Sequence, residues 1–325
     1  MKWVLIIMSA LIAFIVSGCN SRCDVINDCS DKFVVCQFNM RFILENDGLV
    51  LERKKLPNGK TKVVYDGSQT WEKRAPLIEA FLKYNDVDIC GTQELRKEQV
   101  EFFDKIKPEF EYFGMPSIPQ KYNEKDSCAN NIIIYKKSRF ELLQKGDFWL
   151  SDTPEQVSNS FEAPYPRNCN WGKFKDKHTG KIFYFFNTHI HHIGVENQEK
   201  SAKLILRKIR EIAGETPLFL TGDFNMSETH IGMKHFFESD YIIDARQICK
   251  TSVYGSTFTD NFGYTGKKTI GFPTVPEKIK QQSWIDWVFV SKNINVFKYG
   301  VLAECYNGVW LSDHYPLLLK VSINK

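Results

Sequence analysis

The sequence lacks the closely spaced cysteines, the repeats and the charge excess that mark several protein classes. Its nine cysteines include no pair separated by two residues, which argues against a zinc knuckle. It has no repeat of fixed period and no low-complexity tract, so no repeat architecture is expected. With 43 basic and 39 acidic residues, a formal net charge of +4, the chain is not suited to being wrapped by nucleic acid, although a local basic patch is compatible with this balance.

Long hydrophobic runs are also scarce, and the N-terminus holds the one that matters for targeting. Lys2 precedes a 14-residue run from Trp3 to Val16, which is short for a membrane span but has the length of a secretory signal. The ending Val16-Ser17-Gly18-Cys19 resembles a bacterial lipobox, in which Cys19 carries lipid. We therefore expect a signal peptide (1–18), a tether (19–31) and a folded domain (32–325). The alternative is an uncleaved anchor helix. Both interpretations place the domain outside the cytoplasm, and the first predicts an exported lipoprotein anchored to the membrane, either periplasmic or at the cell surface.

The remaining cysteines are scattered, so their connectivity does not follow from the sequence. In an exported protein some of them can pair, and Cys23 with Cys29 is one such pair. Cys36 and Cys90 lie within apolar runs, where the role of a small buried hydrophobe is favoured.

The hydrophobic pattern predicts a β-rich chain with a few amphipathic helices. Residues 45–70 carry turn signals and a basic stretch, which favours a solvated hairpin at 49–64 over a binding patch. Residues 250–283 are polar and rich in Gly and Thr, as in a loop. Helices are expected at 71–84, 196–213 and 228–238. Strands are expected at 33–38, 88–92, 131–135, 140–150, 171–175, 182–186, 217–225, 284–290, 309–312 and 316–323.

Polar side chains end several of these strands. The stretch PLFLTGDFN, residues 217–225, reads as a buried strand that delivers Asp223 and Asn225 at its carboxyl end, where α/β sheets present their chemistry. Taken alone, it also fits a simple Asp-Asn turn. Other predicted strands end in similar residues, namely Asn39, Glu94, Asn187, His189, Asp313 and His314. A further predicted strand contains the carboxylate of Asp286. Carboxylates and amides suit Mg²⁺ or Mn²⁺, and histidines can move protons near neutral pH.

Six of these segments, in this order, resemble the endonuclease/exonuclease/phosphatase superfamily, which includes DNase I-like nucleases, sphingomyelinases and inositol polyphosphate phosphatases. The similarity runs from about residue 33 to 323. It implies a four-layered DNase I-like sandwich, with two mixed β-sheets flanked by helices, and a metal-dependent phosphoesterase. The segments are Asn39-Met-Arg, Gln93-Glu94-Leu, Asn187-Thr-His189, Gly222-Asp-Phe-Asn225, Ile285-Asp286-Trp-Val-Phe and Ser312-Asp-His314.

The resemblance implies a metal site and a proton-transfer site. Glu94 matches the principal ligand of Mg²⁺ or Mn²⁺, Asn39 lies beside it, and Asp313 completes or approaches the metal shell. His314 matches the histidine that activates water, and Asp286 the carboxylate that orients it.

The remaining implied roles concern the phosphate and the attacking water. Asp223 and Asn225 match the pair placed against nucleophile and phosphate, and whether Asp223 or His314 takes the proton of the water stays open. His189 resembles a histidine that donates to the phosphate or leaving group. Asn187 and Asn225 are expected near the phosphate.

A narrower resemblance, to an exported bacterial branch, rests on Pro166-Arg167 with Trp171 and on Trp71-Glu-Lys-Arg74. It implies that Arg167 touches phosphate. That branch usually has Asp at the position of His191. Any role of that Asp in the family is therefore not expected of this chain. If the strand continues, His189 and His191 face one way and His192 the other, which favours a lining of the cleft over a metal cluster.

The sequence says least about the substrate. The loop at 250–283 mixes Lys267, Lys268, Lys278 and Lys280 with Asp260 and Glu277, which suits a pocket as well as a duplex. We expect a monomer that hydrolyses a small or headgroup-sized phosphate ester. The alternatives are a secreted nuclease, a sphingomyelinase-like phosphodiesterase, and a binding module that has lost its activity.

Overall fold

The computed structural model describes residues 31–44, 46–48, 50–114, 130–253, 257 and 284–324. The expected signal peptide, Cys19, nearly all of the tether, the pair Cys23 and Cys29, and almost all of the loop between 254 and 283 lie outside these residues. Within the described part of the chain, no helix is long and apolar enough to span a membrane.

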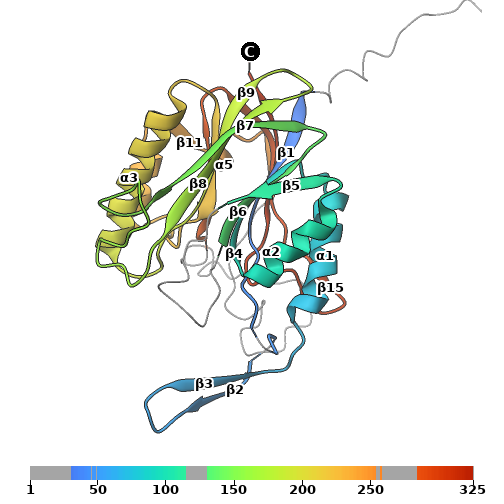
Figure 1. The fold of residues 1–325 in the computed structure, drawn as a ribbon, viewed down its shortest axis with the longest axis vertical. Coiled ribbons are helices and arrows are strands. Elements are labelled where there is room, and N and C mark those ends of the chain that lie inside the picture. The colour runs from blue at the N-terminus through green and yellow to red at the C-terminus, as the bar shows by residue number, and fades with distance from the viewer. Residues whose placement is uncertain are drawn as a thin grey trace, which may run out of the picture.

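Two mixed sheets lie face to face, with helices on their outer faces (Figure 1). The first sheet has the order β12 (Thr251–Val253), β14 (Ile294–Val301), β17 (Leu317–Ile323), β1 (Lys32–Asn39), β4 (Ile89–Leu95), β6 (Asn130–Lys136) and β5 (Phe110–Phe113). The second has the order β11 (Ile242–Asp244), β13 (Asp286–Ser291), β10 (Leu218–Asp223), β9 (Ile182–His189), β8 (Asn168–Asp176) and β7 (Phe140–Trp149).

The helices complete four layers, which confirms the expected sandwich. Against the first sheet lie α1 (Trp71–Tyr84), α2 (Lys97–Phe103) and the short 3₁₀ turn η2 (Asp104–Ile106). Against the second lie α3 (Val195–Ala213) and α4 (Ile231–Phe237), with the one-turn α5 (Ala245–Ile248) beside β11. Two small hairpins stand apart from the sheets, namely β2 (Val50–Lys55) with β3 (Thr61–Tyr65), and β15 (Cys305–Tyr306) with β16 (Val309–Trp310).

The alternation of side chains along β1 builds two cores from one strand. Phe33 points toward the second sheet, where its ring lies 5.6 Å from that of Phe183 and 5.7 Å from that of Phe219. Phe38 points the other way and packs on Phe81 of α1, with ring centroids 6.0 Å apart. The strand is therefore buried on both faces, as its apolar run predicts.

Toward one edge the aromatic layer between the sheets gives way to buried amides. Gln37 and Gln93 exchange hydrogen bonds of 2.6 and 2.9 Å, and Gln93 also donates to Asn187 Oδ1 at 2.6 Å across the two sheets. The sheets come close here because β4 has Gly91, where a Cβ atom would meet Thr221 Oγ1 at 2.2 Å. This amide layer forms the floor beneath the polar strand ends.

The structure shifts several predicted boundaries and adds elements. The expected strand at 309–312 is only the two-residue β16, and the helix expected from residue 228 begins at Ile231 because His230 caps it by accepting from Gly232 N. Strand β12 lies at the start of the expected loop. The five described cysteines, among them Cys36 and Cys90, are all free.

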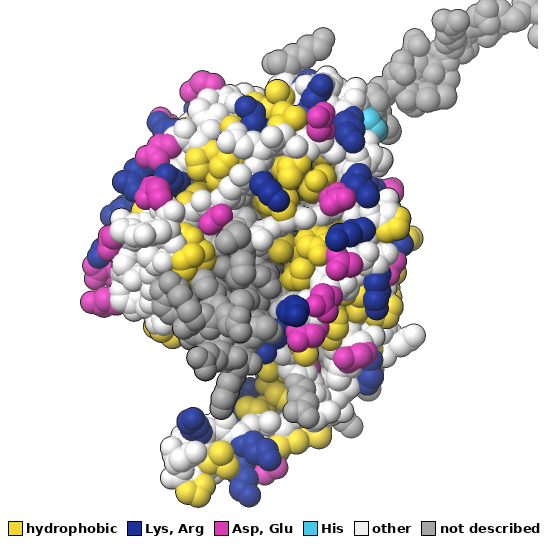
Figure 2. Space-filling model, viewed as in Figure 1, with side chains coloured by type: hydrophobic (Ala, Val, Ile, Leu, Met, Phe, Trp, Pro, Cys, Tyr) yellow, Lys and Arg dark blue, Asp and Glu magenta, His cyan; other side chains and the backbone are white. Residues whose placement is uncertain are grey.

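The β2–β3 hairpin is solvated, as expected, with nearly all described side chains of β2 exposed. Figure 2 shows Lys and Arg gathered over it, while charges of both signs alternate over the rest of this face.

Candidate active site

The polar strand ends meet at one edge of the sandwich because neighbouring strands place them in register. Parallel pairing of β10 with β9 sets Asp223 opposite His189, and antiparallel pairing of β10 with β13 sets Asp223 opposite Asp286. Side chains that face each other across neighbouring strands lie on the same side of a sheet. His189, Asp223 and Asp286 therefore form one row that faces the first sheet. Asp286 starts β13 rather than lying within it as the sequence suggested.

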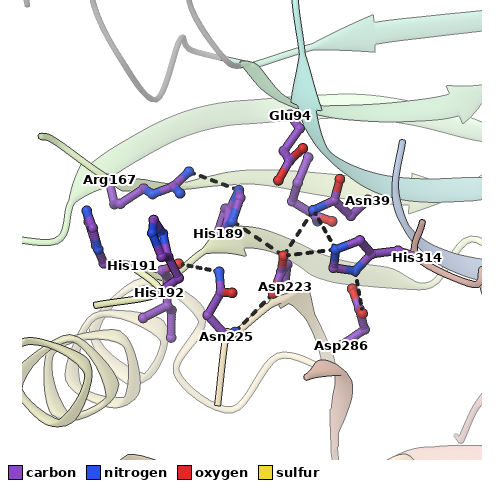
Figure 3. Close-up of polar contacts among 12 residues, drawn as sticks. Asn39, Glu94, Arg167, His189, His191, His192, Asp223, Asn225, Asp286 and His314 are labelled. Atoms are coloured by element: carbon purple, nitrogen blue, oxygen red, sulfur yellow. Dashed lines mark hydrogen bonds and ion pairs between the residues drawn. The ribbon is translucent and has the colours of Figure 1, made fainter. Parts of the chain in front are cut away.

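The backbone is locally strained where two of the predicted site residues lie. Glu94 has φ 67° and sits at an irregularity in the β4–β6 pairing between Thr92 and Leu95. Asn225 has φ 52°. Residues other than glycine rarely adopt a left-handed conformation, and such strain gathers at functional sites. The irregularity turns the Glu94 carboxylate into the site, whereas regular alternation after Gln93 would direct it to the opposite face of the sheet (Figure 3).

The carboxylate of Asp223 lies at the centre of the site (Figure 3). Its Oδ2 accepts from Asn39 Nδ2 at 3.0 Å and lies 3.4 Å from His189 Nε2 and 3.8 Å from His314 Nε2. Its Oδ1 accepts from Asn225 N at 3.0 Å. Residues from both sheets therefore converge on this one buried carboxylate, whose pKa burial raises above its usual range.

His314 and Asp286 form a buried pair, with Nδ1 and Oδ2 2.8 Å apart. Burial alone would lower the pKa of His314, but the carboxylates of Asp286 and Asp223 outweigh it and raise that pKa to about 10. Because Asp286 holds Nδ1, the other ring nitrogen is directed at Asp223 and Asn39, 3.4 Å from Asn39 Nδ2. His314 is thus oriented as in a triad, with its second ring nitrogen turned to the centre of the site.

His189 has a defined tautomer. Arg167 Nη1 lies 2.9 Å from His189 Nδ1, and because a guanidinium only donates, Nδ1 accepts. The hydrogen is then on Nε2, which faces Asp223. Burial, followed by the charge of Arg167, lowers the pKa of His189 well below its usual value. The ring therefore acts as a neutral donor that points at the centre.

Two groups of side chains have ligand atoms close enough for a metal ion. Glu94, His189 and Asp223 form one, Asp223, Asp286 and His314 the other, and within each group the ligand atoms lie within 4.8 Å of one another. Glu94 is only partly buried, and its one hydrogen-bond donor among the described residues is Phe42 N at 3.3 Å. A nearly uncommitted carboxylate beside a second one fits Mg²⁺ or Mn²⁺. Such an ion supplies, when bound, charge stabilisation to phosphoryl oxygens.

Asp313 belongs to neither group. Its carboxylate pairs with Arg41, whose guanidinium also makes a two-point ion pair with buried Asp47, with Nε 2.8 Å and Nη2 3.0 Å from the carboxylate oxygens. The structure thus places Asp313 at the margin, with its charge already offset by an arginine.

Asn187 requires a correction, because its amide has no capacity left for a phosphate. Its Nδ2 donates to Thr92 O at 2.8 Å and to Ile132 O at 3.2 Å in the opposite sheet. Its Oδ1 accepts from Gln93 at 2.6 Å and from Thr221 at 3.3 Å. The oxygens of a phosphate accept hydrogen bonds, so only the two Nδ2 hydrogens could serve them, and both are used. Asn187 therefore holds the two sheets together below the site.

His191 and His192 differ from the alternation expected of a continuing strand. Strand β9 ends at His189, so the two rings stack on each other with centroids 5.0 Å apart instead of facing opposite ways. Neither belongs to the two metal-ligating groups found among the described residues. Burial, followed by the charge of Arg167, lowers the pKa of His191 to about 4.

Sequence reasoning missed three side chains that position the site. Gln37 Nε2 donates to Asp286 Oδ1 at 3.2 Å. Gln37 lies two residues before Asn39 on the same strand, so the alternation of side chains could have predicted that both face the same way. Gln198 Nε2 donates to Asn225 O at 2.8 Å and so fixes the turn after β10. Arg41, which neutralises Asp313, follows Asn39 by two residues, but its left-handed backbone, with φ 53°, gives no sign in the sequence.

Comparison with known proteins finds this fold in others. A mannosyl-6-phosphatase of Bacteroides thetaiotaomicron superposes with a TM-score of 0.72 at 30% identity, covering 90% of this chain and 100% of the other. An endonuclease/exonuclease/phosphatase family protein from the same species gives the same score and identity over 90% and 98%. The uncharacterized protein L388 of Acanthamoeba polyphaga mimivirus is 25% identical over 268 residues, 77% of this chain and 91% of its own. The family model matches residues 36–314, and the chain belongs to the Endonuclease/Exonuclease/phosphatase family.

Proposed function

We propose that the protein is a hydrolase of phosphate esters that depends on Mg²⁺ or Mn²⁺ and acts by direct attack of water. The observation that carries this proposal is the convergence of two histidines and an asparagine on Asp223 Oδ2, within 3.0 to 3.8 Å. One histidine is backed by a carboxylate and the other by an arginine. This arrangement provides one group that exchanges a proton with water and one that donates to phosphate.

The roles follow from what backs each side chain. His314, held by Asp286, is suited to exchange a proton with the attacking water, while Asp223 positions that water. His189 Nε2 donates toward the phosphate or the leaving group. Glu94, with Asn39 beside it, is suited to hold the metal ion, since its carboxylate is nearly uncommitted. A binding module without chemistry is less well supported, because it has no need of a strained Glu94.

The substrate class is inferred from a relative and from the charge of the chain. The name of the mannosyl-6-phosphatase supports a small phosphate ester, as does the small formal net charge of +4, since a nuclease would need a basic groove. We therefore propose a small or headgroup-sized ester, with a DNase I-like nuclease or a sphingomyelinase-like phosphodiesterase as the alternative.

One panel of substrates tests this proposal. At fixed Mg²⁺ and two salt concentrations, the purified protein is expected to hydrolyse sugar phosphates or phosphoinositides and to stop with EDTA. Hydrolysis of sphingomyelin alone would promote the sphingomyelinase-like alternative. Efficient nicking of plasmid DNA that weakens steeply with salt, with the other substrates untouched, would promote the nuclease. Inertness toward the whole panel, RNA included, would favour the binding module.

We also propose that the protein is exported and anchored to the membrane through lipid on Cys19. The support is the segment from Lys2 to Cys19, which resembles a lipoprotein signal. Labelled palmitate is expected to enter the wild-type protein and not Cys19→Ser. A soluble, unlabelled wild-type protein would remove the lipid anchor from the account.

A further inference from the structure

The side of His189 away from Asp223 holds two buried donors without partners. His191 is 1% and Arg167 7% exposed. His191 Nε2 and Arg167 Nε are enclosed, and neither has a hydrogen-bond partner in the described part of the chain. Buried polar groups in native proteins are nearly always paired with protein, water or a ligand, and these two donors lie beside a candidate active site, where a ligand can pair with them.

Both orphan groups are donors. His191 Nδ1 accepts from Ile193 N at 3.1 Å, so the ring hydrogen is on Nε2. Arg167 Nη1 already bonds to His189, and a guanidinium has no acceptor. The two orphan groups at this end of the site, Arg167 Nε and His191 Nε2, are therefore both N–H bonds. Such a lining suits the oxygens of an anion.

This end of the site is also filled by protein. The ring of Tyr165 lies 4.4 Å from that of His191, and the Arg167 guanidinium carbon lies 5.1 Å from the centre of the same Tyr165 ring. Tyr165 therefore packs against both orphan donors, and its ring has to shift for an oxygen atom to reach them.

We propose that Arg167 and His191, beside His189, form a closed donor pocket for the terminal phosphate of a monoester, and that His191 makes the site select monoesters over diesters. This inference rests on the proposed function of the site. A monoester phosphate has one alcohol arm, three terminal oxygens and close to two negative charges at neutral pH. A diester has two alcohol groups and a single negative charge. It therefore needs space for a chain on each side of the phosphorus, and it binds the N–H donors less strongly than a monoester does.

Two substrates with the same leaving group test the proposal, 4-nitrophenyl phosphate and bis(4-nitrophenyl) phosphate, at fixed Mg²⁺. The wild type is expected to prefer the monoester in kcat/KM. His191→Ala is expected to lower kcat/KM for the monoester about tenfold or more, mainly through KM, and to change the diester less, because only the monoester fills the pocket. His191→Gln, which keeps an N–H group, is expected to recover part of the loss.

Calorimetric binding of inorganic phosphate supplies a readout that does not depend on turnover. It is expected to weaken in His191→Ala and to stay near wild type in the control His235→Ala, whose ring pairs with Glu199 on the contact between α4 and α3. Thermal melting separates these effects from misfolding, and His191→Gln serves if the alanine variant does not fold. A diester preference in the wild type, or phosphate binding unchanged by both His191 variants, would overturn the inference. If neither ester is hydrolysed, the proposed function fails, and the phosphate titration still decides the pocket.

Discussion

His314→Ala is expected to lower kcat by at least about a hundredfold with a small change in Tm, because general acid–base groups contribute that much. The ring is oriented by the 2.8 Å contact with Asp286 and lies 3.8 Å from Asp223, so its loss removes the proton-exchanging group and leaves the strands intact. The measurement is steady-state kinetics on the best ester of the panel, with thermal melting of both proteins.

A second histidine provides the matched control. His235 Nε2 lies 3.0 Å from Glu199, on a contact between α4 and α3, outside the groups that converge on Asp223. His235→Ala is therefore expected to keep kcat near wild type. If His314→Ala retained kcat within a few-fold of wild type, the role given to the His314–Asp286 pair would be wrong.

Glu94→Ala is expected to abolish most of the activity at low Mg²⁺ or Mn²⁺, with part of the loss recovered at high Mn²⁺. The reason is that Glu94 is the least committed carboxylate of the site and is held there by a strained backbone, so its removal acts chiefly through the metal. The measurement is activity against Mn²⁺ concentration for both proteins. Glu98→Ala removes an exposed carboxylate four residues away and is expected to follow the wild-type curve.

Much of this site was predictable because strand periodicity and strand ends are properties of short segments. The apolar run before Asp223 and the one before Asn39 each specify a buried strand, and the polar residue after each is read directly. Which ends meet depends on pairing between strands far apart in the chain. Periodicity alone does not show which strand ends meet. The order of the six motifs predicted it, because that order resembles a family whose members bring these segments together.

The roles of individual amides and charges were less predictable. Asn187 looks like another strand-end ligand, but its four hydrogen bonds come from segments about 35 to 95 residues away, so only the packed sheets show that it is saturated. The same holds for Asp313, whose charge is offset by Arg41, 272 residues earlier.

Strand β14 shows why an element was missed altogether. Its buried residues Ile294 and Val296 alternate with exposed ones, but the register shifts between Val296 and Lys298, after which Tyr299 and Val301 are the buried positions. A bulge moves the apolar positions by one residue, so neither half shows enough alternation to predict a strand.

Calorimetric titration of Mn²⁺ into the wild-type protein and into Glu94→Ala measures the metal site without a substrate. We expect the wild type to bind Mn²⁺ and the affinity to fall at least about tenfold in Glu94→Ala, because a ligand is lost. Equal affinities in the two proteins, or no binding by the wild type, would contradict the assignment of this edge of the sandwich as a metal-dependent site.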